Sequence, residues 1–349
     1  KILDIGFLDV TKIEQKLLAE PMAEEIGVEM PDTPIMPSII DKASRYSHYK
    51  ELVSPDGYVN TEHINIGDLV GKKVILLDIW TYSCINCQRT LPYITAWYDK
   101  YRDAGLEIIG IHTPEFAFEK IKANVEDATK RFGIEYPVIL DNHYQTWNAY
   151  GNRYWPRKYL IDIDGFIVYD HIGEGAYDET EAKIQELLKE RSDKLNERSE
   201  IDKSIVEISG APNPDADSPE TYFGSARNSY LSNGTPGKSG EQNFTKPLNT
   251  LFNRLYLTGK WNIQSEYAES VSENARIIYK YKAKNVYIVA EADKPIKVQI
   301  LKDGVESGVM HVESSRLYTL IEESGDAEQH TLELIVEDPG ARFFAFTFG

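Results

Sequence analysis

Residues 73–92 read KVILLDIWTYSCINCQRTLP. The segment from 73 to 80 is almost continuously apolar, which is typical of a strand buried on both faces of a sheet. Residues 84–101 carry an apolar face at helical spacing, and Pro92 falls inside this predicted helix and is expected to kink it. The sequence therefore predicts a strand that leads directly into a helix, and the helix begins at a pair of cysteines.

Cys84 and Cys87 are the only cysteines in the 349 residues of the chain. A structural zinc site needs about four ligands, usually two such pairs or added histidines, and the sequence offers neither beside this pair. An isolated C-x-x-C motif therefore favours redox chemistry. No metal is expected, and no cofactor beyond a redox-active Cys84–Cys87 disulfide.

The position of each cysteine predicts its role. Cys84 stands where the strand leads into the helix, and unpaired N–H groups and the dipole at a helix N-terminus stabilise a thiolate. We expect Cys84 to be the attacking sulfur and Cys87, one turn inside the helix, to be the resolving thiol. Asp78 lies in the apolar strand, either facing outward or as a buried acid that accepts the Cys87 proton.

The pattern divides the chain into four parts. Residues 1–54 form a proline-interrupted extension, expected to lie as a tether along the next part. Residues 55–200 alternate strands and helices in the order β-α-β-α-β-α-β-β-α, an α/β layer fold with one long helix predicted over 116–132. Residues 201–220 have the composition of a linker. Residues 221–349 contain seven short strands and no helical segment, as in an antiparallel all-β sandwich or jelly roll.

Composition excludes some classes of function. The formal net charge of −18 argues against nucleic acid and anionic membrane surfaces as partners. Hydrophobic residues make up 42% of the chain, but no run approaches the roughly 18–20 apolar residues of a membrane span. Because the sequence begins at Lys1, we expect an upstream segment such as a signal peptide or membrane domain to be missing.

Residues 74–87, with Pro92 five residues after the second cysteine, resemble the active-site segment of the thioredoxin superfamily. Trp155-Pro156, just before a predicted strand, stands where that superfamily has its cis-proline loop. The resemblance implies a thioredoxin-like fold in which Pro156 is cis and faces the two sulfurs. It also implies a substrate groove, for which the candidate residues are Trp80, Trp155, Ile85 and Asn86.

A closer resemblance is to the DipZ-type proteins, in which a TlpA-like thioredoxin domain precedes a carbohydrate-binding-module-like β-sandwich. It covers about residues 56–349 and is carried by short segments at 81–87 (TYSCINC), 112–116 (HTPEF), 141–142 (DN), 146–151 (TWNAYG), 220–224 (ETYFG), Trp261 and 266–269 (EYAE).

The DipZ resemblance implies an extracytoplasmic protein, in the periplasm or at the cell surface, tethered through a missing N-terminal segment. It implies disulfide-bonded substrate proteins, a CcdA-like membrane electron donor and a cell-envelope carbohydrate ligand. Trp261 and Tyr267 are the candidate sugar-binding residues, because sugar sites use exposed aromatic faces, although strands are rich in packed aromatics anyway.

Four functions remain open. The leading one is a thiol–disulfide oxidoreductase that works as a reductase; an oxidase or isomerase on the same scaffold is the second, and the reduction potential distinguishes them. A peroxidase is suggested by the T-x-x-C spacing of Thr81 and Cys84. The last is a glycan-binding protein with a redox-inactive scaffold. His112 is expected to be a packed strand-end histidine, and Glu115 either to tune Cys84 or to cap the following helix.

Overall fold

The computed structural model describes residues 39–197, 200–208 and 216–349. Most of the predicted tether and the centre of the predicted linker lie outside the described residues. The described end of the tether begins with helix α2 (Ile39–Arg45) and then follows the α/β part, where the Tyr49 amide donates to the Gly165 carbonyl at 2.8 Å. The described parts of the linker, 201–208 and 216–220, contain no helix or strand.

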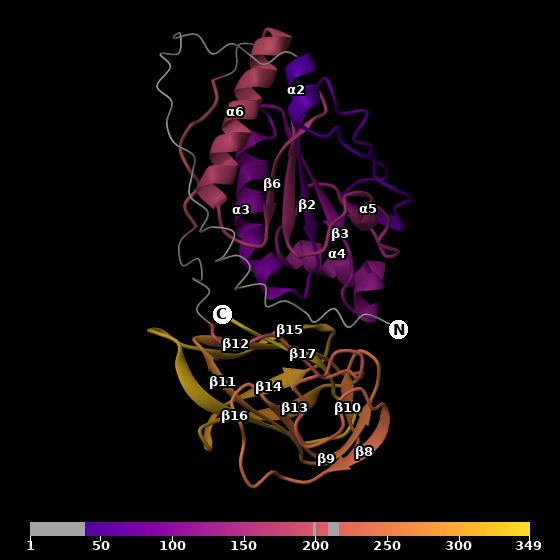
Figure 1. Ribbon diagram of the computed structural model, residues 1–349, viewed down its shortest axis with the longest axis vertical. Helices are drawn as coiled ribbons and strands as arrows, with labels where there is room; N and C mark the ends of the chain where they lie inside the picture. The colour runs from indigo at the N-terminus through magenta and orange to yellow at the C-terminus, as the bar shows by residue number, and fades with distance from the viewer. Residues whose placement is uncertain (1–38, 198–199, 209–215) are drawn as a thin grey trace. The chain divides into compact units, whose positions relative to one another are not determined.

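The first half is built on a six-stranded mixed sheet with the order β1-β4-β3-β2-β5-β6 (Figure 1). Strands β2, β3 and β4 are parallel, whereas β1, β5 and β6 run antiparallel to their neighbours. This arrangement places the fully buried strand β2 between two neighbours, as its apolar sequence predicts. The strands are β1 (Gly57–Val59), β2 (Val74–Trp80), β3 (Leu106–His112), β4 (Val138–Leu140), β5 (Arg157–Ile161) and β6 (Ile167–Ile172).

Helices cover both faces of this sheet. Alternate residues of β2 separate the two layers: Leu76 belongs to the same buried cluster as residues of α3 and α6, and Leu77 to the same cluster as Trp147 of α5. None of the helices in the described part of the chain is long and apolar enough to cross a membrane. The helices are α3 (Ile85–Tyr101), the 3-10 helix η1 (Ala117–Lys120), α4 (Lys122–Arg131), α5 (Gln145–Ala149) and α6 (Tyr177–Leu195).

The helix predicted over 116–132 is two helices. The backbone of Ile121 is extended, with φ −78° and ψ 112°, and it separates η1 from α4. The Glu119 side chain explains why the first turn stays separate. Its carboxylate accepts the amides of Glu115 and Phe116 at 2.6 and 2.9 Å, which closes a compact turn at the end of β3.

The second half is all-β and antiparallel, as predicted, and its strands hydrogen-bond into one 11-stranded sheet that curls nearly into a barrel (Figure 1). The end strands β14 and β15 contact each other. The seven predicted strands form β11 to β17, and four more precede them. The strands are β7 (Thr221–Tyr222), β8 (Gly240–Phe244), β9 (Leu255–Ile263), β10 (Ala268–Ser270), β11 (Ala275–Ala283), β12 (Asn285–Glu291), β13 (Ile296–Lys302), β14 (Val305–Val312), β15 (Arg316–Glu322), β16 (Glu328–Val336) and β17 (Arg342–Phe348).

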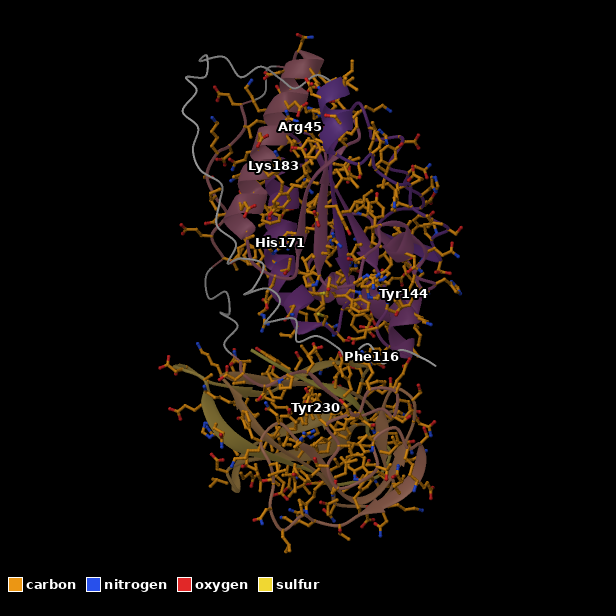
Figure 2. All side chains as sticks on the ribbon, viewed as in Figure 1. Arg45, Phe116, Tyr144, His171, Lys183 and Tyr230 are labelled. Carbon is orange, nitrogen blue, oxygen red and sulfur yellow. The ribbon has the colours of Figure 1, made fainter. Side chains whose placement is uncertain are left out.

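Side chains of the two halves touch beside η1. The Phe116 ring (Figure 2) lies 5.1 Å from the ring of Phe344 in β17. Arg227 forms a 2.7 Å ion pair with Glu115, and the Ala117 amide donates to Glu266 at 2.9 Å. The segment that follows β3 is therefore held by both apolar and charged contacts from the second half.

Candidate active site

Cys84 is the N-cap residue of α3. Its backbone is extended (φ −78°, ψ 123°), and its carbonyl accepts the Gln88 amide at 3.0 Å in the first turn of the helix. The side chain is half-buried, whereas Cys87 is almost fully buried, and both are free thiols in the structure. Cys84 is therefore the sulfur that a substrate can reach, and Cys87 is the shielded one, as the sequence predicts.

Cys87 is difficult to ionise. Burial raises the pKa of its thiol well above the usual value, and the hydrogen bond and charge of Cys84 raise it further. The negative charge of Asp78 acts in the same direction, while the Thr81 backbone lowers the pKa. Cys87 therefore reacts as a thiolate only when a nearby base takes its proton.

Asp78 can be that base. Its side chain is 1% exposed, and burial raises the pKa of its carboxyl to about 7, with the positive charge of Lys158 opposing the shift. Of the two readings of Asp78, the outward-facing one is wrong and the buried acid is observed. A carboxyl that titrates near neutral pH can both accept and release a proton under working conditions.

Lys158 is a site residue that the sequence reasoning missed. It pairs with Asp78 across β2 and β5, it is fully buried, and its Nζ donates to the Gly173 carbonyl at 3.1 Å. The signal for it was a lysine inside the strand that follows Trp155-Pro156. The positive charge of a buried lysine next to a buried aspartate stabilises the ionised carboxylate.

The peptide bond between Trp155 and Pro156 is cis, as the resemblance implied. The indole of Trp155 is half-buried and fixed in place, because its Nε1 donates to the Thr113 carbonyl at 3.0 Å and its ring lies 4.3 Å from that of Trp147. Trp155 and Cys84 pack against the same apolar core. Trp155 thus has a half-exposed aromatic ring whose position is fixed by these contacts.

The other groove predictions have mixed outcomes. Trp80 is fully buried, so it has no surface for a substrate, and its assignment to the groove is wrong. Residues at the end of a strand face either side of the sheet, and the register of β2 turns Trp80 into the core. Ile85 is 6% exposed. Asn86 is half-buried, and its Oδ1 accepts a 2.8 Å hydrogen bond from Arg89.

Two buried charged residues hold the segment around the cysteines. Glu119 accepts the amide and hydroxyl of Ser83 at 3.2 and 2.7 Å, directly before Cys84. Arg89 donates to Glu174 from Nε and Nη2 at 2.8 Å each, and the same Nη2 reaches Asn86 inside the motif. No local pattern indicates either role, because each depends on a partner far along the chain.

The structure shows the surroundings of His112 and Glu115. His112 is fully buried, burial lowers its pKa to about 3, and its ring lies 5.1 Å from that of Trp80, so the packed reading is confirmed. The Glu115 carboxylate binds side chains of the second half instead of capping the following helix. Its Oε1 accepts hydrogen bonds from Arg227 at 2.7 Å and from the Tyr222 hydroxyl at 3.0 Å.

The sugar-binding prediction fails for Trp261. This side chain is fully buried, its Nε1 donates to the Thr258 carbonyl at 2.9 Å, and no face is left for a pyranose ring. Tyr267 is half-buried, and its ring packs 5.3 Å from that of Phe344. Trp261 serves packing, which is the common use of such residues in strands, whereas the assignment of Tyr267 stays a prediction.

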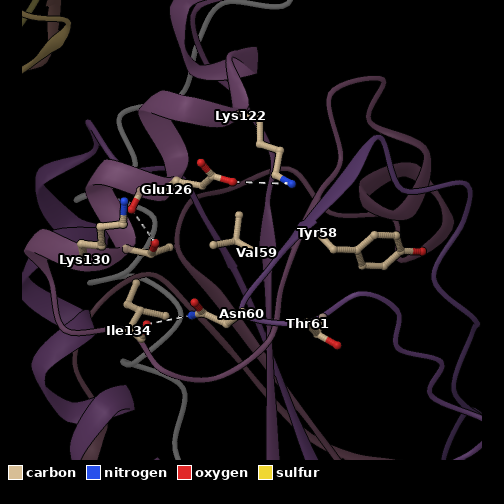
Figure 3. A pocket seen from close by; sticks show the side chains of 9 residues that line it. Tyr58, Val59, Asn60, Thr61, Lys122, Glu126, Lys130 and Ile134 are labelled. Carbon is tan, nitrogen blue, oxygen red and sulfur yellow. Dashed lines mark hydrogen bonds and ion pairs between the residues drawn. The ribbon is translucent and has the colours of Figure 1, made fainter.

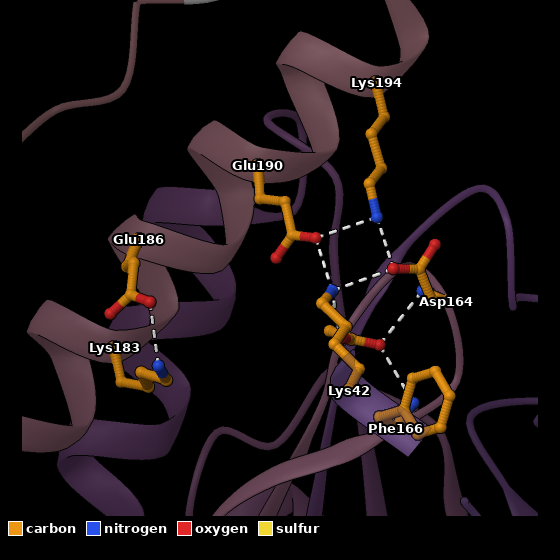
Figure 4. A network of polar contacts seen from close by, with 8 residues as sticks. Lys42, Asp164, Phe166, Lys183, Glu186, Glu190 and Lys194 are labelled. Carbon is orange, nitrogen blue, oxygen red and sulfur yellow. Dashed lines mark hydrogen bonds and ion pairs between the residues drawn. The ribbon is translucent and has the colours of Figure 1, made fainter. Parts of the chain in front are cut away.

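A pocket of about 360 Å³ lies between β1 and α4, away from the cysteines, and no predicted site residue lines it (Figure 3). A cluster of Asp162, Asp164 and Glu190 has the spacing of metal ligands. Lys42 already lies among them, with Nζ 2.5 Å from Asp162 and 2.8 Å from Asp164 and a third contact to Glu190 (Figure 4). The ammonium group occupies the position that a cation would take.

Two family models cover the two halves. Residues 50–170 match the AhpC/TSA family, and residues 218–349 match a family described as thioredoxin like C-terminal domain. Protein DipZ of Mycobacterium tuberculosis is 36% identical over 302 residues, which are 84% of this chain and 41% of DipZ. The chain therefore spans about two fifths of the length of this relative.

Thiol-disulfide oxidoreductase ResA of Bacillus anthracis is 31% identical over 124 residues, which cover 36% of this chain and 68% of ResA. Among solved structures, StoA from Bacillus subtilis is 21% identical, with a TM-score of 0.32 over 36% of this chain and 91% of that one. The C-x-x-C geometry and the similarities to DipZ and ResA agree: the chain belongs to the thioredoxin-like thiol–disulfide oxidoreductase family that includes ResA.

Proposed function

We propose that this chain is an extracytoplasmic reductase of protein disulfides that acts through Cys84 and Cys87. The observation that carries the proposal is the burial of Cys87 together with Asp78, whose carboxyl has a pKa near 7. A thiol that resists ionisation and a base that titrates at neutral pH form a proton-transfer pair. Cys84, half-buried at the N-terminus of α3, is left accessible for the first attack.

The reaction has two exchange steps. The Cys84 thiolate attacks one sulfur of the substrate disulfide, a mixed disulfide forms, and the other substrate sulfur leaves as a thiolate that takes up a proton. Cys87 then gives its proton to Asp78 and attacks the Cys84 sulfur. The Cys84–Cys87 disulfide forms, and the second substrate sulfur leaves as a thiolate and is protonated. The substrate disulfide gains two electrons, and the protein dithiol is oxidised by the same amount.

The reaction requires an oxidising compartment, where its substrates persist, and an electron donor that reduces the protein again. Disulfide-bonded substrates persist in oxidising compartments, which supports a location outside the cytoplasm. Each turnover consumes the dithiol, so a donor must reduce the Cys84–Cys87 disulfide again. We assign this role to a CcdA-like membrane carrier, on the basis of the DipZ resemblance. The Ile85-Asn86 dipeptide between the cysteines contains no histidine to stabilise a thiolate further, which favours reduction over strong oxidation.

Variants and a reduction potential test the proposal. Cys84→Ser is expected to abolish the reduction of insulin disulfides, and Cys87→Ser to accumulate a mixed disulfide through Cys84. A potential near or below about −220 mV supports a reductase, and one between about −120 and −180 mV indicates an oxidase or isomerase instead. Insulin reduction that persists without both cysteines would refute the assignment.

A peroxidase is the second candidate. Thr81 and Cys84 have the T-x-x-C spacing, and residues 50–170 match the AhpC/TSA model. Turnover of hydrogen peroxide that depends on Cys84 and exceeds the rate of insulin reduction would favour it.

A further inference from the structure

A histidine and three carboxylates gather in the second half of the chain. His330 lies in β16, Asp303 in the turn between β13 and β14, and Glu323 directly after β15. Glu328 precedes His330 by two residues on the same strand, so both side chains face the same side of the sheet. Zinc binds histidine nitrogens and carboxylate oxygens as well as cysteine sulfurs, and this set of side chains therefore has the chemistry of a zinc site.

Asp303 fixes the imidazole ring of His330. Nδ1 of His330 donates to Oδ2 of Asp303 at 2.7 Å, and the Thr331 amide donates to Oδ1 at 2.8 Å, so both carboxylate oxygens are used. An ionised carboxylate only accepts hydrogen bonds, so the ring proton of His330 lies on Nδ1, and Nε2 of the neutral imidazole carries a lone pair. Histidines that bind metals almost always donate their other ring N–H to such a partner.

Two further carboxylates lie beside Nε2 of His330. Oε2 of Glu323 is 3.8 Å from this nitrogen and Oε2 of Glu328 is 3.9 Å from it, too far for hydrogen bonds. Zinc–ligand distances of about 2.0–2.2 Å at a tetrahedral ion place a nitrogen and an oxygen about 3.4 Å apart, so each oxygen needs to move by about half an ångström. The two glutamate side chains are 35% and 75% exposed, which leaves room for this shift. Lys302 pairs with Oε1 of Glu323 and leaves Oε2 available to a metal.

A buried tyrosine beside this cluster has an unpaired hydroxyl. Tyr281 lies directly opposite His330 across β11 and β16, so the two side chains share a face of the sheet, and their rings are 6.0 Å apart. The Tyr281 side chain is fully buried, and its hydroxyl has no hydrogen-bond partner among the described residues. Burial raises the pKa of Tyr281, and the charges of Glu323 and Asp303 raise it further, which places the hydroxyl near these carboxylates. Nearly all buried polar groups are paired, so this hydroxyl requires a partner from outside the described residues.

We propose that this cluster binds one zinc ion through Nε2 of His330 and the Oε2 atoms of Glu323 and Glu328. Asp303 is then the residue that orients the imidazole. Three protein ligands leave the fourth position of zinc to a water, and a hydrated ion beside Tyr281 gives its hydroxyl a partner. The two glutamate charges balance the charge of the ion. Because the ion joins β16 to the segment after β15, bound zinc should also stabilise the folded second half.

Calorimetric titration with zinc chloride tests the site in the full chain. Cys84 and Cys87 are both replaced with Ser for this experiment, because free cysteine thiols bind zinc themselves. We expect one zinc ion per chain, and His330→Gln is expected to abolish the binding. Asp303→Asn should weaken it by about 10- to 100-fold, the usual cost of losing the partner of a metal-bound histidine. The matched control is His311→Gln, because His311 is exposed on β14, and its zinc binding should not change.

Glu328→Gln and thermal unfolding guard against a variant that binds no zinc because it is misfolded. The Glu328 side chain is 75% exposed, so its loss is not expected to disturb folding, and weaker zinc binding is expected. Zinc should raise the Tm of the chain with His311→Gln and leave the Tm with His330→Gln unchanged. Absence of zinc binding, or equal binding in His330→Gln and His311→Gln, would overturn the proposal. Neither readout requires disulfide exchange, so a failure of the reductase assignment would be seen separately.

Discussion

Replacing Asp78 with Asn is expected to stabilise the folded protein at high pH. The folded chain holds the Asp78 proton up to a pKa of about 7, whereas the carboxyl in the unfolded chain loses it near 3.8. Between these two values the folded state binds more protons than the unfolded state, so the free energy of unfolding falls as the pH rises. Above pH 7 the wild-type protein carries the full penalty of a buried carboxylate, and the Asn variant carries none.

The magnitude follows from the two midpoints. They differ by 7 − 3.8, or about 3 pH units, and each unit corresponds to about 1.4 kcal/mol. The total loss in the free energy of unfolding is therefore about 4 kcal/mol. The linkage relation predicts that about 2 kcal/mol of this loss occurs between pH 5.5 and pH 8. This is a large fraction of the roughly 5–15 kcal/mol by which domains are stable.

Urea unfolding of the reduced proteins at pH 5.5 and pH 8 measures the effect. At each pH, the free energy of unfolding of the wild type is subtracted from that of Asp78→Asn. The difference cancels the titration of groups that the two proteins share. Asp99→Asn is the control, because Asp99 lies on α3 with 67% of its side chain exposed, and a change within about 0.5 kcal/mol is expected at both pH values. A stability difference between Asp78→Asn and wild type that does not change with pH would refute the reasoning.

Three further predictions concern other polar contacts in the first half of the chain. Lys42→Met leaves the buried carboxylate of Asp162 without its cation and is expected to lower the free energy of unfolding by about 3 kcal/mol, measured by urea unfolding. Lys158→Met removes the charge that opposes the effect of burial, so the NMR titration midpoint of Asp78 should rise above about 7; a fall would contradict this account. Trp155→Phe loses an anchoring hydrogen bond, and insulin-reduction kinetics should show a higher KM with kcat nearly unchanged.

Local sequence patterns predicted most of the fold because they depend on nearby residues. The apolar run of β2, the helical face of α3 and the seven C-terminal strands can all be derived from periodicity. Strand β9 (Leu255–Ile263) was missed since Gly259 and Lys260 interrupt its alternation, and it forms through pairing with β8, β10 and β11. Pairing with distant strands overrides a weak local signal there.

The residues of the candidate site divide in the same way, into those that local patterns identify and those that depend on pairing between distant strands. The two cysteines and Pro156 could be identified because their chemistry and spacing are local. Whether a strand residue faces the core depends on register, so Trp261 was assigned to a surface that it does not reach. Lys158 could not be placed beside Asp78 without knowing that β5 pairs with β2.

Asp78 combines a loss of stability with a chemical role. It lies between Leu77 and Ile79 in a strand whose residues are all buried, where an apolar side chain would avoid the desolvation penalty. Asp78→Asn removes that penalty and also removes the base that accepts the Cys87 proton. The variant should therefore be more stable at pH 8 and slower in resolving mixed disulfides, a pairing of effects that a purely structural carboxylate would not produce.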